Sequence, residues 1–211
     1  MAVIVCFGDS NTWGTVPNDT RRYDHTQRWP ALLNNALANV EVIEAGQQGR
    51  TLIHNDPFQG ERAAQLYLTD YLEKHTPDLV IILLGTNDLK AKFALTAKEV
   101  AQSAALLADK TQQYQYSSKQ QLTKVLLVAP PPIYEVGFYA NMYAGAAVKS
   151  MQLAKYYQQY AQQVACAFFD AATVITSCQE EGVHWQADQH QLLADALLVV
   201  VKGLLADTSK T

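Results

Sequence analysis

The sequence has few cysteines and no block of like charge, and these absences exclude whole classes of protein. Its 211 residues include only three cysteines, Cys6, Cys166 and Cys178, an odd number without regular spacing. This pattern argues against a disulfide framework and against a zinc site. No run of lysine and arginine interrupts the mixed charge, whose formal sum is -4 at pH 7. Nucleic acid is therefore not an expected partner.

Long apolar runs are also missing. No stretch approaches the roughly 20 apolar residues that span a bilayer, so no membrane partner is expected. The apolar run at residues 2–7 has no basic segment before it and is too short for a secretory signal. We therefore expect a cytoplasmic protein. The length and the 49% hydrophobic content favour a single domain over residues 1–211.

Apolar segments of strand length alternate with amphipathic segments of helix length. The predicted strands are residues 2–7, 40–44, 79–84, 124–129 and 165–170. The third is an unbroken run of leucine, valine and isoleucine, which is typical of a central strand covered on both faces. The alternation of strands and helices predicts an α/β fold with a parallel sheet and right-handed crossovers. Functional loops of such folds gather at the carboxyl ends of the strands.

The helical segments carry their own signals. The predicted helices are residues 29–37, 59–74, 97 to about 115, 148–164 and 188–205. Thr96-Ala97-Lys98-Glu99 is a capping-box pattern, which predicts that one helix begins directly after Thr96. Residues 116–121 are polar and are predicted to form a loop or a frayed helix end. The tail after residue 206 is also predicted to be frayed.

A candidate nucleophile follows the first predicted strand, in Gly8-Asp9-Ser10-Asn11. A serine hydroxyl is a poor nucleophile unless a base lies within hydrogen-bond reach. At a strand-to-helix turn, the N–H of Ser10 could also face an oxyanion. Taken alone, the pattern more often marks a serine that caps a helix.

A candidate base lies just before the last predicted helix, in Gly182-Val183-His184. An imidazole titrates near neutrality, so His184 could take the serine proton and return it to the leaving alcohol. Glu181 is three residues away and could fix the imidazole tautomer. The alternative for each residue is an exposed loop side chain, which is the preferred interpretation for Glu180. Of the other histidines, His190 is predicted to lie on a helix surface or end.

Two further blocks offer oxyanion donors. Gly49 follows the second predicted strand, where a glycine lets the backbone N–H approach a ligand closely. Asn87 follows the third, and its side-chain NH₂ could complete an oxyanion hole. A turn glycine and an Asx turn are the alternatives. Asp9 and Asp88 flank these positions and are predicted to tie down loop N–H groups rather than to react.

Taken together, these blocks resemble those of a known family. Gly8-Asp9-Ser10, Gly49, Asn87 and His184 look like the four characteristic blocks of the SGNH (GDSL) hydrolases, and the similarity covers nearly the whole chain. It is closer still to the arylesterase and acyltransferase branch, whose Gly-Asp-Ser-x-Thr-Trp-Gly block is similar to residues 8–14.

The resemblance implies a fold and a set of roles. The fold would be a three-layer α/β/α, flavodoxin-like sandwich with a five-stranded parallel sheet. Ser10 would be the nucleophile and His184 the base, with Ser10, Gly49 and Asn87 forming the oxyanion hole. The family needs no metal or organic cofactor, and some members of this branch form homo-oligomers.

The sequence departs from the family pattern at three places. The residue three before the histidine is usually aspartate, whereas it is Glu181 here. Glutamate keeps the charge and both acceptor oxygens, so we expect a working triad with a shifted loop. Gln47-Gln48 precede Gly49, and Asn11 stands where the family often has leucine.

Substrate signals are weaker. Trp13, Trp185 and the aromatic segment 130–143 are predicted to wall a cleft for a small-molecule ester, although tryptophans also pack under loops. The leading hypothesis is a serine esterase for short-acyl, aryl or acetyl esters, acting through an acyl-serine, with acyl transfer to alcohols as a further outcome. The alternative is a catalytically impaired SGNH-fold protein that binds a carbohydrate or small molecule. A flavodoxin-like nucleotide binder is disfavoured because no Gly-x-Gly-x-x-Gly fingerprint is present.

Overall fold

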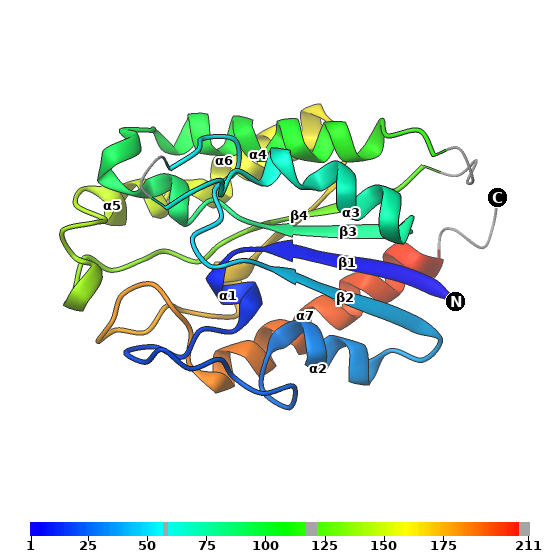
Figure 1. The fold of residues 1–211 in the computed structure, drawn as a ribbon, viewed down its shortest axis with the longest axis horizontal. Helices are drawn as coiled ribbons and strands as arrows, with labels where there is room; N and C mark the ends of the chain where they lie inside the picture. The colour runs from blue at the N-terminus through cyan, green and yellow to red at the C-terminus, as the bar shows by residue number, and fades with distance from the viewer. Residues whose placement is uncertain (57–58, 117–121, 207–211) are drawn as a thin grey trace.

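The computed structural model describes residues 1–56, 59–116 and 122–206 and contains one five-stranded sheet. All strand pairs are parallel, in the order β2-β1-β3-β4-β5 (Figure 1). The strands are β1 (Ala2–Gly8), β2 (Val40–Gly46), β3 (Leu79–Leu83), β4 (Lys124–Ala129) and β5 (Ala167–Asp170). The predicted α/β class and five-stranded parallel sheet are confirmed.

Helices cover both faces of the sheet and make the three-layer sandwich that was predicted (Figure 1). One face carries α3, α4 and α6, and the other carries α2 and α7. The helices are α1 (Ser10–Trp13), α2 (Trp29–Ala36), α3 (Leu68–His75), α4 (Ala97–Gln112), α5 (Ala146–Ser150), α6 (Leu153–Gln163) and α7 (Ala187–Ala206). Short 3₁₀ turns cover Ala64–Leu66, Asn87–Leu89, Ala91–Phe93, Gly137–Tyr139 and Ala171–Thr173.

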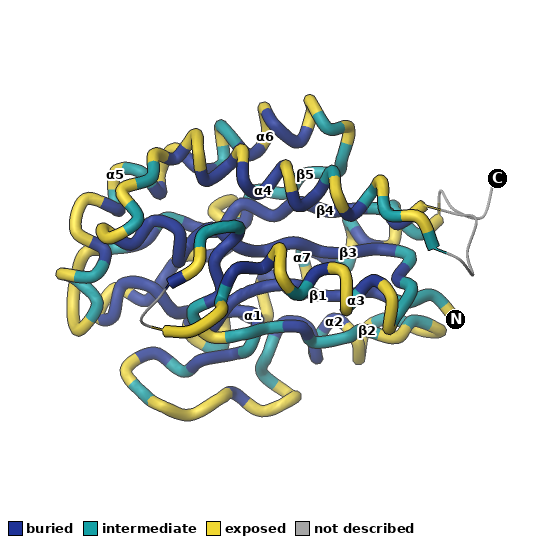
Figure 2. Tube along the Cα trace, turned by 45° about the horizontal axis from the view of Figure 1, so that its top comes forward, coloured by how far each residue is buried: buried dark blue, intermediate teal, exposed yellow. Residues whose placement is uncertain are grey.

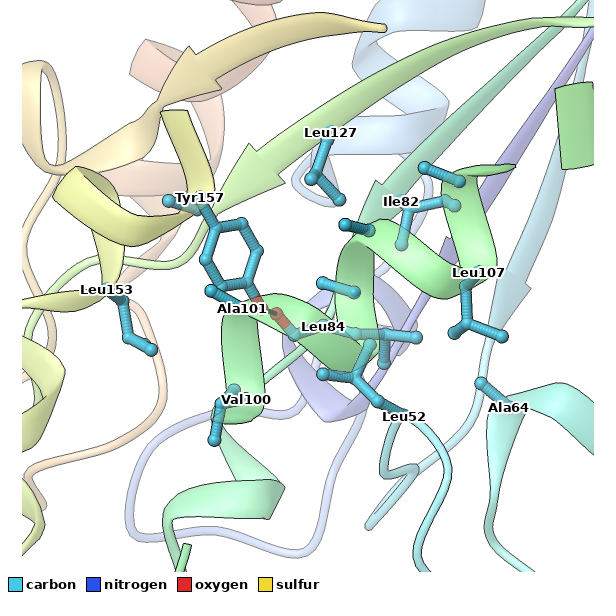
Figure 3. Packing of buried hydrophobic residues seen from close by; sticks show 14 of the residues in the cluster. Leu52, Ala64, Ile82, Leu84, Val100, Ala101, Leu107, Leu127, Leu153 and Tyr157 are labelled. Carbon is cyan, nitrogen blue, oxygen red and sulfur yellow. Dashed lines mark hydrogen bonds between the residues drawn. The ribbon is translucent and has the colours of Figure 1, made fainter. Parts of the chain in front are cut away.

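The central strand β3 is buried along its whole length, as its unbroken apolar sequence predicted. Successive side chains point to opposite faces, so Val80 and Ile82 pack under α4 and α6 while Ile81 packs against α2 and α7. Figure 3 shows Ile82 beside Leu127 of β4, with side chains of the covering helices around them. Burial is concentrated along the sheet, and the outer helix faces are exposed (Figure 2).

The capping box at the start of α4 is formed as predicted. The N–H of Glu99 donates to Thr96 Oγ1 at 3.2 Å, and the N–H of Thr96 donates to Glu99 Oε2 at 2.8 Å. Each bond satisfies a donor that the first helical turn cannot pair internally.

Several boundaries differ from the sequence prediction. The helix predicted at 59–74 begins only at Leu68, because Thr51 bonds the backbone of Arg62 and Ala64 and holds that stretch as a loop. The helix predicted at 148–164 is divided into α5 and α6. Most of the loop predicted at 116–121, and the tail after 206, lie outside the described residues.

Helix α7 corrects the expectation about membrane-length segments. Its 20 residues reach a mean hydropathy of 1.3, long and apolar enough to cross a bilayer by length and composition alone. Isolated charged residues interrupt this segment, so the sequence shows no unbroken apolar run of that length. In the structure, Leu193, Leu197 and Val201 pack one face of α7 into the core beneath the sheet.

The loops after the strands lie at the opposite edge of the sheet from the start of β1 and the end of α7. Gly8 pairs with Gly46 and with Leu83, so the chain leaves β1, β2 and β3 at the same edge of the sheet. The start of β1 and the end of α7 lie at the opposite end of the molecule (Figure 1). Because the strands are parallel and run in the same direction, the loops that follow them gather on one side of the molecule.

Candidate active site

A cavity of about 450 Å³ lies where these loops meet. Ser10 follows β1, Gly49 follows β2 and Asn87 follows β3, while His184 comes from the loop before α7. All four line the cavity, so the structure brings together the four sequence blocks.

Ser10 is the first residue of the single-turn helix α1. Asp9 caps that turn, since its carboxylate accepts the N–H of Asn11 at 3.0 Å. Burial raises the pKa of Asp9 to about 6, although the Asn11 N–H and the nearby His184 act in the opposite direction. Asp9 thus ties down a loop N–H, as predicted, and points Ser10 into the cavity.

Ser10, His184 and Glu181 form a hydrogen-bonded chain. Ser10 Oγ lies 3.0 Å from His184 Nε2, and the other ring nitrogen, Nδ1, contacts Glu181 Oε1 in a short hydrogen bond. All three residues are buried. Burial alone would raise the pKa of Glu181, but its bonds to His184 and Val183 outweigh burial and hold that pKa below its ordinary value. An ionised carboxylate is thus held against the ring.

The loop that carries Glu181 and His184 is fixed by its own backbone. Glu181 Oε2 accepts the N–H of Val183 at 2.9 Å and of His184 at 2.7 Å. The N–H of Cys178 donates to the carbonyl of His184 at 2.8 Å. Gly182 has a φ of +97°, and a Cβ there would lie 2.2 Å from the carbonyl oxygen of Tyr134. Only glycine therefore fits this position without displacing the loop.

The three candidate oxyanion donors belong to residues that line the cavity. Within the described residues, the N–H groups of Ser10 and Gly49 donate to no other protein atom. The side-chain oxygen of Asn87 accepts from Tyr143 Oη at 3.3 Å, which orients the amide so that its NH₂ points the other way. That NH₂ makes only a long bond of 3.5 Å to Asp9. The arrangement can stabilise a negatively charged oxygen.

Sequence reasoning missed two residues that support the site. Arg50 is buried, and its guanidinium donates to the carbonyl of Gly8 at 2.9 Å and to that of Ala45. Its position directly after Gly49 was the available signal. Tyr143, which orients Asn87, was noted only as part of an aromatic segment. Asp88 accepts the N–H of Leu52 at 3.0 Å and so has the structural role predicted for it.

Asn11, one of the places where the sequence departs from the family pattern, makes a hydrogen bond to the loop that carries Glu181 and His184. Asn11 Nδ2 donates to the carbonyl of Val183 at 3.3 Å. Val183 in turn donates its N–H to Glu181, so the Asn11 side chain connects α1 to the loop that carries the histidine.

The predicted substrate role of Trp185 is wrong. Its side chain is fully buried among residues of α2 and α7, because a large apolar ring at that position completes the core. Trp13 lines no described cavity and lies instead under the guanidinium of Arg22, 5.2 Å away. Aromatic walls come from the segment predicted at 130–143, through Tyr139 and Tyr143.

Other acid and histidine side chains are outside the chain of hydrogen bonds. Glu180 is exposed and accepts a hydrogen bond from Cys178 Sγ at 3.0 Å. His190 is buried rather than on a helix surface, and burial lowers its pKa to about 3. Among residues 1–56, 59–116 and 122–206, no group of three or more histidine, cysteine or acidic side chains is placed to hold a metal ion.

The fold and this site define a hydrolase of the SGNH type. The model of the GDSL-like lipase/acylhydrolase family matches residues 4–197, so the chain belongs to this family. No curated protein matches the sequence.

Solved structures agree with the family. A carbohydrate acetylesterase family member from Sinorhizobium meliloti is 30% identical with a TM-score of 0.93, covering 98% of this chain and 100% of its own. The native aryl esterase of M. smegmatis is 34% identical with a TM-score of 0.92, covering 97% and 100%. A lipase/acylhydrolase from Enterococcus faecalis, 19% identical with a TM-score of 0.69 and coverage of 96% of both chains, shares the fold.

Proposed function

We propose that this protein is a serine esterase for small carboxylic esters. The observation that carries the proposal is the buried chain of hydrogen bonds from Glu181 through His184 to Ser10, in a cavity that Gly49 and Asn87 also line. A nucleophile, an oriented base and oxyanion donors are the parts that acyl transfer from an ester requires.

The proposed reaction has two halves. Ser10 Oγ attacks the ester carbonyl carbon while its proton passes to His184 Nε2, and the N–H groups of Ser10 and Gly49 with the Asn87 amide stabilise the oxyanion. The carbon–oxygen bond to the alcohol then breaks, and His184 returns the proton to the leaving alcohol. Water repeats the sequence on acyl-Ser10 and releases the acid.

Esters with short acyl groups are the proposed substrates. The names of the similar structures, a carbohydrate acetylesterase and an aryl esterase, support acetyl and aryl esters. Gln48, Lys90 and Arg62 give part of the cavity a polar wall, which suits small polar esters better than long acyl chains. Alcohols are proposed as secondary acceptors of the same acyl group.

Hydrolysis of p-nitrophenyl acetate tests the proposal. We expect Ser10→Ala to lower kcat at least about 10³-fold, because no other group in the chain of hydrogen bonds can form the acyl intermediate. Ser103→Ala, which removes a hydroxyl bonded to a carbonyl inside α4, is the matched control and should keep wild-type activity.

Two additions extend this assay. Butyrate and octanoate esters should react progressively more slowly than acetate, and benzyl alcohol measures the share of acyl groups transferred rather than hydrolysed. Equal activity of the wild type and Ser10→Ala, or no activity in either, would contradict the proposed role of Ser10 with these esters.

A further inference from the structure

Two cationic side chains line the same cavity as Ser10. Lys90 lies three residues after Asn87, where two 3₁₀ turns meet, and Arg62 comes from the loop that follows β2. The backbone next to Lys90 is fixed to the opposite wall, because the N–H of Ala91 donates to the carbonyl of Met142 at 2.9 Å.

Neither cation has a carboxylate partner in the part of the chain that the structure describes. Lys90 is only 4% exposed, yet no hydrogen bond or ion pair involves its Nζ there. Arg62 donates its Nε to the carbonyl of Gln59 at 3.0 Å and makes no ion pair with a described residue. Most buried ammonium groups are paired, because leaving water without a partner is costly.

Charged side chains near the two cations are already in ion pairs. Asp19 is the one acid among the described residues of the cavity wall, and it pairs with Arg21 at 2.7 Å. Lys92, two residues after Lys90, pairs with Asp56. The ion pairs of the surrounding surface thus leave the two cations of the cavity free.

Buried acids behind the site compensate Lys90 only partly. Burial lowers the pKa of the Lys90 ammonium, and Lys92 acts in the same direction. Asp56, Asp9 and Asp88 oppose the shift. Burial also raises the pKa of Asp88 to about 7, so this acid carries less than a full negative charge near neutral pH. An anion arriving in the cavity would therefore meet an ammonium whose counter-charge is only partly supplied by the protein.

We propose that Lys90, assisted by Arg62, binds a carboxylate of the substrate, so that this esterase prefers anionic esters. The inference rests on the proposed function and adds a substrate class to it. The carboxylate could belong to the acyl chain or to the alcohol, as in an acylated sugar acid. Both sources share the same recognition chemistry, in which charged donors hold carboxylate oxygens.

Two matched pairs of esters distinguish the sources. p-Nitrophenyl hemisuccinate against p-nitrophenyl butyrate places the charge on the acyl side. 4-Acetoxybenzoate against its methyl ester places it on the alcohol side. The measured quantity is the ratio of kcat/KM for the anionic ester to that for the neutral ester, each corrected for spontaneous hydrolysis.

We expect Lys90→Met to lower this ratio roughly tenfold in one of the pairs, because the loss of a hydrogen bond to a charged group weakens binding by about this factor or more. Arg62→Gln should lower it in the same pair by a smaller factor. Lys98→Met is the control, because it removes one positive charge from the exposed side of α4 and should leave the ratio unchanged. A purely structural role for Lys90 would lower both rates together and leave the ratio unaltered.

Binding without turnover provides an independent measurement. In Ser10→Ala, the anionic ester of the pair that responds to Lys90→Met should bind more tightly than its neutral partner by calorimetry, and adding Lys90→Met should abolish the difference. Ratios that stay the same in Lys90→Met for both pairs, with no anion preference in binding, overturn the proposal. Absence of neutral ester hydrolysis in the wild type would instead count against the proposed function, while anion binding in Ser10→Ala would still support the Lys90 site.

Discussion

At the scale of single residues, Glu181 contacts both the ring of His184 and the backbone of its own loop. One of its oxygens contacts His184 Nδ1, and the other accepts two backbone N–H groups of the same loop. The carboxylate therefore orients the base and also stabilises the loop that carries it.

These two sets of contacts lead us to expect a loss of activity in Glu181→Gln. An amide has one acceptor oxygen, so either the ring N–H or the backbone N–H groups lose their partner. We expect kcat for p-nitrophenyl acetate to fall by about 10²–10⁴. Glu181→Asp keeps the charge but is too short for both tasks, and its kcat should fall less, by about tenfold.

The neighbouring acid provides the control. Glu180→Gln changes an exposed carboxylate one residue away and should leave kcat near the wild-type value. Wild-type activity in Glu181→Gln would mean that the base needs no carboxylate.

Sequence patterns located the four residues that the structure brings together better than the walls around them. Ser10, Gly49, Asn87 and His184 lie in short blocks whose chemistry is local and whose strands end at one edge of the sheet. Whether a tryptophan lines a cavity or fills the core depends on tertiary packing, and a single sequence carries no sign of this for Trp185. Arg50 escaped notice for a related reason, since its partners are backbone carbonyls that leave no trace in the sequence.

At the scale of elements, the loop from Cys178 to His184 behaves as a small rigid unit. Its two ends are joined by a backbone hydrogen bond, and Gly182 accepts from the N–H of Tyr134 at 2.9 Å. Asn11 attaches the same loop to α1. The serine and the histidine are thus held relative to each other by contacts between the elements that carry them.

Gly182→Ala tests that rigidity. The new Cβ would collide with the carbonyl of Tyr134, so we expect the loop to move and kcat to fall at least tenfold, with a lower midpoint of thermal unfolding. Gly145→Ala is a matched control, because Gly145 also has a positive φ, of +77°, but no atom lies within 4 Å of its Cβ position.

The control should show only the cost of the strained backbone, about 1–2 kcal/mol, with kcat retained. If both variants lost stability equally and kept full activity, the close contact at Gly182 would have no part in placing His184.

Elements were predicted best where one physical signal dominated. The apolar strands were found because burial on both faces removes polar alternation, and α4 was found because its capping box marks the first turn. The start of α3 was missed because the loop before it is held by long-range backbone bonds to Thr51. Strand β5 begins at Ala167 rather than at the predicted residue 165, where Ala165 has a φ of +52°.

At the scale of the whole molecule, Asp88 couples stability to pH. Its pKa rises from 3.8 to about 7 on burial, so the folded protein binds this proton more tightly than the unfolded chain. Between about pH 4 and pH 7, the folded state keeps the proton that the unfolded state has lost. Lowering the pH through this window therefore favours the folded state at this site.

Asp88→Asn cannot titrate at this position and should lose this dependence. We expect the free energy of unfolding of the wild type, minus that of the variant, to increase as the pH falls from 8 to 4. The slope should not exceed about 1.4 kcal/mol per pH unit. Urea titrations across this range measure it, and parallel pH profiles of the two proteins would contradict the prediction.

The start of β1 and the end of α7 lie at the end of the molecule away from the loops that surround Ser10 (Figure 1). A protein bound to a solid support through either of these elements would turn its catalytic face toward the solution. Esters could then reach every attached molecule without passing between it and the support. Attachment through surface groups of the loops after the strands would bring the cavity against the support and block the entry of substrate.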